Sequence, residues 1–280
     1  MLGERQKATA TELAQWWAGI RQGGIGSHAV LLAGPPGWGR STVLDQLPEI
    51  IGGADAPLSL HVRINGRSLP DGPGPQAQAL RDSLLGAEVR RQAAVLLCRS
   101  RQRGVARLGA DSLLASGMAG TISVGLAALA AAAGGSPADA RPAGENGAVA
   151  RAARVVAAVA AANPTLVAID DADYLEPGLA VTMIENLIDH HDSHVLVIAA
   201  VDLGSDLASA LTSRARYGPT AGRVHRAAVD TRMGYRSRAE LAGELSPHLS
   251  PDEAQRLAQQ NLTFAEIFAA TRSRPLPPTR

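Results

Sequence analysis

The chain has 280 residues, of which 27 are lysine or arginine and 26 are aspartate or glutamate, giving a formal net charge of +1. This balance excludes the strong basic field on which non-specific nucleic-acid binding usually depends. The length suits one large domain or a domain with a small appendage, and the single cysteine excludes an internal disulfide. The N-terminal residues lack the layout of a secretory signal, so a cytoplasmic protein is expected.

The first half of the chain alternates helical and strand-like patterns. Residues 9–22 carry apolar side chains at helical spacing, which predicts an amphipathic helix. Residues 28–34 form a short apolar run typical of a buried parallel strand, and residues 58–64 alternate as a second strand would. A proline- and glycine-rich loop is expected at 70–76, followed by one long helix over 77–107.

The second half continues this alternation. Residues 164–175 are expected to form the third strand and its carboxyl end, and residues 194–201 the fourth strand, with a helix between them. A weaker fifth strand is expected at 223–229. Residues from about 235 to 272 read as helical throughout. Strands that alternate with helices predict an α/β fold with a parallel sheet covered on both faces, whose ligand lies at the carboxyl ends of the strands.

Residues 112–137 contain no charged side chain, and their length would admit a membrane span. Because the segment consists mostly of alanine, glycine and serine, its composition favours a glycine-interrupted helix or an insertion packed on the sheet. Membrane contact through 112–133 stays open as the alternative. Residues 136–147 then predict a flexible linker.

A phosphate-binding loop is predicted directly after the first strand. Its sequence GPPGWGRST has the spacing G-x-x-x-x-G-K-[ST], except that Arg40 replaces the lysine. The glycines let backbone N–H groups point at an anion, and a helix that can run up to Pro48 adds its positive end. Ser41 has the hydroxyl that would bind Mg²⁺. The predicted nucleotide-binding residues are Gly34, Pro35, Pro36, Gly37, Trp38, Gly39, Arg40, Ser41 and Thr42.

A pair of carboxylates follows the third strand in the sequence LVAIDD. Four apolar residues deliver Asp170 and Asp171 to the carboxyl edge of the sheet. Asp170 is predicted to hold Mg²⁺ through water, and Asp171 to orient or deprotonate the attacking water. Asp173 reads more simply as a helix cap or a solvated turn residue.

The segments LLAGPPGWGRSTVL, LVAIDDADYL and HVLVIAAV, in this order, resemble the ATPase module of AAA+ and STAND-type P-loop NTPases. The STAND group, which comprises regulatory switches of bacterial transcription and defence, is the closer match. The resemblance implies a five-stranded sheet in the order 5-1-4-3-2, ATP or ADP with Mg²⁺ as ligands, and self-association or contact with other signalling domains. It divides the chain into a nucleotide-binding domain at 1–222, with an insertion and linker at 108–147, and a fifth strand with a helical lid at 223–280.

The chain departs from this family pattern at several positions. Ala199, Ala200 and Val201 occupy the strand end where the family places a polar or basic sensor, which leaves Asp202 as the nearest polar residue. Arg214 and Arg216 are expected to follow the helix after the fourth strand, where the family places an arginine that reaches a neighbour's γ-phosphate. Arg214 is the preferred candidate, and the alternative is that an arginine there is a solvated charge.

Arg40 itself allows two interpretations. A guanidinium group keeps its attraction to phosphate, but it is larger and flatter than an ammonium group, so nucleotide binding with slow hydrolysis is expected. Because Lys7 is the only lysine in the chain, loss of the usual lysine by drift is the alternative.

The leading hypothesis is an ATP-binding conformational or oligomerisation switch. A non-hydrolysing pseudo-ATPase scaffold, a membrane-tethered ATPase and a DNA-associated AAA+ ATPase remain as alternatives. The basic residues that could serve a DNA-associated ATPase are Arg99, Arg101, Arg103 and Arg107. The sequence DHHDSH at 189–194 could suggest a metal site, but exposed histidines at a helix end are the simpler interpretation, and Cys98 reads as an ordinary helix residue.

Overall fold

The computed structural model describes residues 4–35, 37, 39–51, 60–102, 144–189, 192–202, 204–217, 220, 222–228 and 250–260. Its centre is a five-stranded, all-parallel sheet in the order β2-β3-β4-β1-β5, which confirms the predicted fold class and strand order. The strands are β1 (His28–Ala33), β2 (Leu60–Asn65), β3 (Thr165–Asp170), β4 (Val195–Val201) and β5 (Val224–Ala228).

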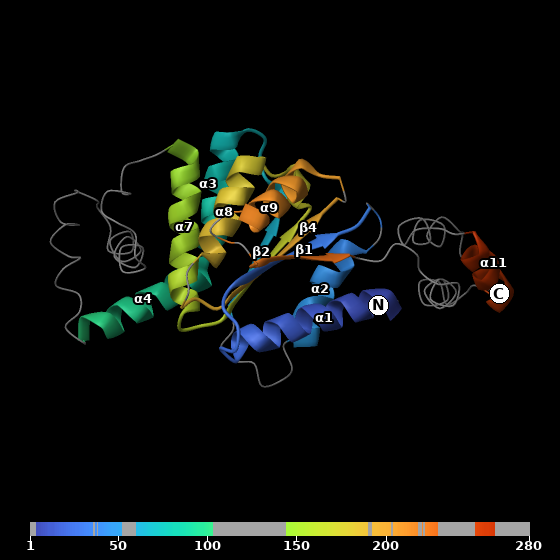
Figure 1. The fold of residues 1–280 in the computed structure, drawn as a ribbon, viewed down its shortest axis with the longest axis horizontal. Coiled ribbons are helices and arrows are strands. Elements are labelled where there is room, and N and C mark those ends of the chain that lie inside the picture. The colour runs from blue at the N-terminus through green and yellow to red at the C-terminus, as the bar shows by residue number, and fades with distance from the viewer. Residues whose placement is uncertain are drawn as a thin grey trace, which may run out of the picture.

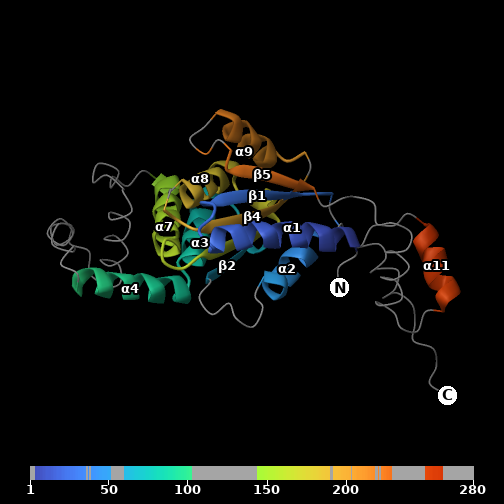
Figure 2. The ribbon, with the colours of Figure 1, turned by 60° about the horizontal axis from the view of Figure 1, so that its bottom comes forward.

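Helices cover both faces of the sheet (Figures 1 and 2). One face carries α1 (Glu4–Arg21) and α2 (Arg40–Ile51). The other face carries the remaining helices that pack on the sheet, and α4 extends from their edge. These helices are α3 (Pro73–Leu84), α4 (Ala87–Gln102), α7 (Gly144–Ala160), α8 (Pro177–Ile188) and α9 (Asp206–Tyr217).

The sheet has a hydrophobic core on each of its two faces, and the strand sequences explain both. In β4, alternate side chains starting at Val195 pack under α7 and α8, and those starting at Leu196 pack under α1 and α2. β3 and β4 are buried at every position because helices cover both of their sides, which requires the continuous apolar runs seen in the sequence. β2 lies at an edge, and its burial alternates instead.

The expected long helix over 77–107 is wrong, because two helices occupy this part of the chain. α3 begins at Pro73, inside the expected loop, since proline is favoured at the first position of a helix. Leu85 then leaves the helical backbone (φ −93°, ψ 39°), and α4 starts after Gly86. α2 likewise continues past Pro48 to Ile51, because a proline in the last turn removes only one helical hydrogen bond.

α7 was not predicted from the sequence, and it begins inside the expected linker 136–147. The signal was present: Val149, Val156 and Val159 lie on one helical face and are fully buried, with alanines between them. α7 packs against α3 and α8 and against β3 of the sheet.

Near the C-terminus the structure describes α11 (Pro251–Gln259), which begins with a capping box formed by Ser250 and Glu253. Ser250 has extended backbone, so the expectation of helix throughout 235–272 is wrong at this point. The neighbouring residues 231–249 and 261–280 lie outside the described residues, as does the uncharged segment 112–137. None of the described helices combines the length and apolar character needed to cross a bilayer.

A histidine pair joins β1 to the edge strand β5. His28 Nδ1 and His225 Nε2 lie 3.0 Å apart, and the ring of Trp16 from α1 stacks near both, 4.3 Å from the His225 ring and 5.1 Å from the His28 ring. One ring nitrogen must accept the hydrogen bond, so the pair cannot carry two protonated rings. Burial lowers the pKa of His28, and the nearby His225 and Arg223 charges lower it further; burial also lowers the pKa values of His61 and His225.

These lowered pKa values predict loss of stability in mild acid. Below the unfolded value of about 6.5, the unfolded chain binds protons that the folded chain does not bind, so the free energy of unfolding decreases as pH falls toward the folded pKa values. Urea unfolding at pH 7.5 and pH 5.5 should show a clear drop at the lower pH. In the His28→Gln/His225→Gln double variant the drop should be smaller, and equal drops in both proteins would contradict the assignment.

Candidate functional site

The loop between β1 and α2 has the geometry of an anion cradle. Gly34 N–H donates to the Val201 carbonyl oxygen (3.2 Å), which ties the start of the loop to β4. Gly37 (φ 80°) and Gly39 (φ 83°) adopt left-handed backbone that other residues rarely adopt. Because the first N–H groups of α2 have no partner within the helix, the loop ends on a set of free donors. Pro36 and Trp38 lie outside the described residues.

α1 closes over this loop. The side chain of Gln6, which is buried, lies against Gly39: a Cβ added there would come within 2.4 Å of Gln6 Nε2. The glycine at position 39 is therefore required both by its backbone angle and by the packing of α1. Gln6 was not predicted to lie beside the loop, because β1 separates the two positions in the chain.

Arg40, at the position of the usual lysine, is 8% exposed and points at carboxylates. Its Nη1 lies 2.6 Å from Asp202 Oδ1, at the end of β4, and 3.9 Å from Asp173 Oδ2. The nitrogen and the Asp202 oxygen are close enough for an ion pair, but they do not have hydrogen-bond geometry. Asp202 N–H also donates to Asp173 Oδ2 (2.6 Å). Asp173 is thus a partner of the loop arginine, and its interpretation as a helix cap or a solvated turn residue is wrong.

The two halves of the predicted site meet at Ser41 and Asp170. Ser41 Oγ donates to Asp170 Oδ1 (2.9 Å), and the same oxygen accepts from Asp171 N–H (3.0 Å). Asp170 is 5% exposed, and its second oxygen lies 3.8 Å from Arg63 Nη2 of β2. Arg63 also pairs with Asp45 of α2. The contact brings the hydroxyl and the carboxylate predicted to serve Mg²⁺ within hydrogen-bond distance.

Asp171 sits in left-handed backbone (φ 48°) at the carboxyl end of β3. Its Oδ2 lies 3.5 Å from Arg67 Nε, and Arg67 Nη2 donates to the Tyr174 hydroxyl (2.9 Å) while the guanidinium covers the Tyr174 ring. The hydrogen bond to Tyr174 and the charge of Asp171 raise the pKa of Arg67. Asp171 therefore faces an arginine, as do the other carboxylates of this edge.

Two residues outside the predicted set hold this segment in place. Gln76 of α3, which is buried, donates through Nε2 to the Tyr174 carbonyl oxygen (3.0 Å) and accepts from Glu176 N–H (2.5 Å). Gly66 of the 3-10 turn η1 (Gly66–Ser68) lies so close to Asp171 that an added Cβ would be 2.2 Å from its carbonyl oxygen. Neither residue carries a sequence signal of its own, since the contacts join segments about a hundred residues apart.

The structure places some of the remaining predicted residues and does not describe the others. Thr42 lies in the first turn of α2, beside Ser41. Arg214 lies within α9 and not after it, and its side chain is outside the described part of the structure. Groups of three or more metal-binding side chains are absent from the described residues, whereas His190, His191 and the side chain of Cys98 lie outside them.

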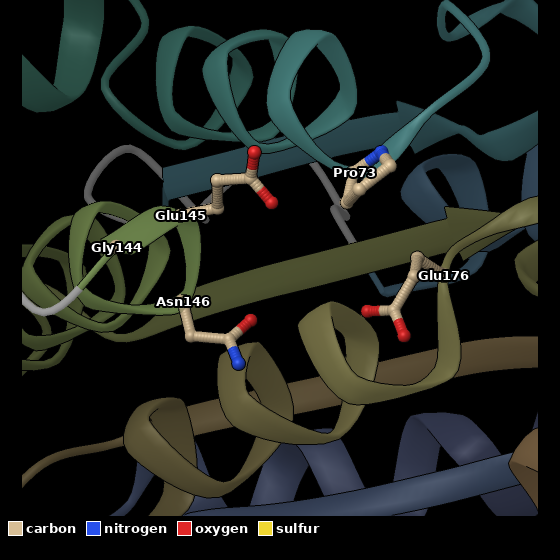
Figure 3. Close-up of a pocket in the computed structure, with 5 residues that line it drawn as sticks. All are labelled: Pro73, Gly144, Glu145, Asn146 and Glu176. Carbon is tan, nitrogen blue, oxygen red and sulfur yellow. The ribbon is translucent and has the colours of Figure 1, made fainter.

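A separate pocket of about 260 Å³ lies at the N-terminal ends of α3, α7 and α8 (Figure 3). Its lining includes the carboxylates of Glu145 and Glu176, which point toward its interior. Glu176 caps α8 by accepting from Leu179 N–H (2.6 Å), and the place of a Cβ on Gly74 is 2.8 Å from Glu145 Oε1. These contacts describe a junction of three helices beside the segment that follows β3.

The residues of the loop fit a nucleotide phosphate. The first N–H groups of a helix have no carbonyl partner in a preceding turn, and the left-handed glycines before α2 leave room for a close approach. Arg40 Nη1 is a buried donor that has an ion pair with Asp202 but no hydrogen bond among the described residues. Ser41 and Asp170 provide the oxygen ligands that Mg²⁺ prefers. The chemistry of these residues is therefore compatible with a nucleotide phosphate and Mg²⁺.

A parallel sheet in this order, with a glycine loop between its first strand and the following helix, defines a P-loop NTPase fold. The chain belongs to the AAA ATPase domain family, whose sequence model matches residues 7–198. It is therefore a nucleotide-binding ATPase module. A search of curated proteins finds no match.

The close approach of Gly66 to Asp171 predicts a strong effect of substitution. In Gly66→Ala the new methyl group would clash with a backbone oxygen, which cannot rotate away, so the acidic segment must move. We expect a loss of about 1–3 kcal/mol in the free energy of unfolding, measured with urea. Gly86→Ala is the matched control, because its nearest contact is an ordinary 3.6 Å, and it should change stability by less than about 1 kcal/mol. Equal effects of the two substitutions would contradict this account of Gly66.

Proposed function

We propose that the chain is a nucleotide-dependent switch of the STAND type, which binds ATP or ADP with Mg²⁺ and hydrolyses ATP slowly. The observation that carries this proposal is the position of Arg40, which is buried in the phosphate loop and held by Asp202 and Asp173. A bound phosphate would take over part of this pairing, because it is a strong acceptor for the guanidinium. Nucleotide binding would then change contacts between the loop and the ends of β3 and β4.

In this proposal, residues 34–42 surround the phosphates, and Ser41 and Asp170 hold Mg²⁺. Asp171 would orient the attacking water, and Arg214 would reach the nucleotide of a neighbouring copy. Residues 1–222 would hold the nucleotide, while residues 223–280, which begin with β5, would carry a lid. The output would be altered self-association or an altered contact with other signalling domains.

Two features support slow hydrolysis. A guanidinium group is larger than an ammonium group and differs in shape, and phosphoryl transfer depends on accurate positioning of the γ-phosphate. Asp171, the candidate for orienting water, faces Arg67 at 3.5 Å. Both features affect the rate more than the affinity.

The same ion pair also favours a second function, a scaffold whose loop no longer binds nucleotide. Arg40 already has carboxylate partners, so the loop can fold without a phosphate. The two functions differ in one measurable property, the binding of ATP or ADP to the folded protein.

The proposed switch makes a first prediction about nucleotide affinity. Calorimetric titration with ATP and ADP in the presence of Mg²⁺ should show binding to the wild type, and Arg40→Ala should weaken it about ten- to a hundredfold, because a charged hydrogen bond to phosphate is worth about 1.5–3 kcal/mol. Arg81→Ala removes a partly exposed arginine of α3 and should leave the affinity unchanged. If the folded wild type binds neither nucleotide, the scaffold function replaces the switch.

The second prediction concerns turnover. The wild-type turnover rate, measured as phosphate release from ATP, should be well below about 1 s⁻¹, which is the lower end of typical enzyme turnover rates. Arg40→Lys restores the compact charge of the usual lysine and should raise the rate at least severalfold. Asp170→Asn in the same background should abolish that gain. Wild-type turnover in the usual range would refute the slow-hydrolysis part of the proposal.

A further inference from the structure

The carboxylates that hold Arg40 lie beside the beginning of the phosphate loop. Ala33 is in register with Val201, and Gly34 N–H donates to the Val201 carbonyl oxygen, so Asp202 follows β4 at the level where the loop leaves β1. Asp173 comes from the turn after β3 and is joined to Asp202 by the 2.6 Å hydrogen bond from Asp202 N–H. Any group that reaches Arg40 therefore also meets both carboxylates.

Several polar atoms of this cluster make no hydrogen bond among the described residues. Arg40 Nη1 and Asp202 Oδ1 form an ion pair at 2.6 Å without hydrogen-bond geometry, and Asp173 Oδ1 is buried without a hydrogen bond among the described residues. A phosphate oxygen would satisfy the arginine nitrogen, since it is an acceptor. It would leave both carboxylate oxygens without a donor, because phosphate and carboxylate are both acceptors and both negative.

The charges of the cluster also disfavour a further phosphate. Arg40 contributes one positive charge, and the two aspartates contribute two negative charges. The side chains of Arg40 and Asp173 are 9% and 19% exposed, so water screens these two charges incompletely, whereas the Asp202 side chain is 43% exposed and has only its Oδ1 atom buried. A second phosphate beyond the one that meets Arg40 would add negative charge beside carboxylates that are already in excess.

From this arrangement we propose that Asp202, supported by Asp173, makes the site prefer nucleoside diphosphates over nucleoside triphosphates. The inference rests on the proposed nucleotide-binding function and adds a specificity-determining residue to it. The diphosphate uses the loop N–H groups and Arg40 without bringing a further charge toward Asp202. The triphosphate has the same contacts and an added repulsion.

The test is the ratio of dissociation constants for ATP and ADP, measured by calorimetric titration with and without Mg²⁺. The wild type should bind ADP about tenfold more tightly than ATP. Asp202→Asn keeps the shape of the side chain and removes its charge, so the preference should fall toward equality, mainly through tighter binding of ATP. Asp173→Asn should shift the ratio in the same direction, and it serves as the second variant if the first does not fold.

Asp206→Asn is the control, because it removes the same charge from an exposed position in the first turn of α9 and should leave the ratio as in the wild type. A wild type that binds ATP as tightly as ADP would overturn the inference and leave the nucleotide-binding proposal standing, as would a ratio that neither asparagine variant changes. A folded wild type that binds neither nucleotide would overturn both.

Discussion

The rest of the site depends on one constraint, the need of a buried guanidinium for nearby negative charge. Arg40 starts the helix after the phosphate loop and is almost fully removed from water, so an unpaired charge there would cost several kcal/mol. Asp202 and Asp173 provide the compensation from the ends of two neighbouring strands. The ion pair thereby couples the loop, the end of β4 and the turn after β3 into one electrostatic unit.

The same compensation repeats along the carboxyl edge of the sheet. Asp170 faces Arg63 from β2, and Asp171 faces Arg67 from the turn that follows β2. These outer arginines are more than half exposed, so their pairs contribute little to stability and can exchange partners easily. Arg40 is different, because its guanidinium is 9% exposed although Asp202 is 43% exposed, so a group that replaces a carboxylate beside it must also carry negative charge.

The backbone at this edge is held by contacts that have no charge. Gly66 allows the turn after β2 to touch the backbone of Asp171. The side-chain amide of Gln76 is hydrogen-bonded to the backbone of Tyr174 and of Glu176, the residues before and after Leu175. Together with the 3-10 turn η3 (Ala172–Tyr174), these contacts keep Asp171 in a backbone conformation that is uncommon for a residue other than glycine. The position of the acidic segment is therefore determined by packing against α3 and β2 as well as by its own sequence.

The sequence by itself determined that the chain forms a parallel sheet with a phosphate loop and carboxylates at one edge. The order of the strands followed from the resemblance to a known family. Such features are local: continuous apolar runs such as HVLVIAAV, glycines at a set spacing, and acids directly after a strand. α7 and the break at Leu85 were missed, because alanine-rich helices have a weak apolar pattern and helix ends depend on their neighbours.

Only the tertiary structure decided what Arg40 contacts. Its partners Asp173 and Asp202 lie more than a hundred residues away in the chain, and no spacing rule connects them with the loop. The roles of Gln6, Gly66 and Gln76 were also invisible in the sequence, because each consists of a close contact between distant segments. Local patterns place residues at an edge of the sheet, but the pairing of charges and the close approach of backbones at that edge are set by how the strands and helices pack.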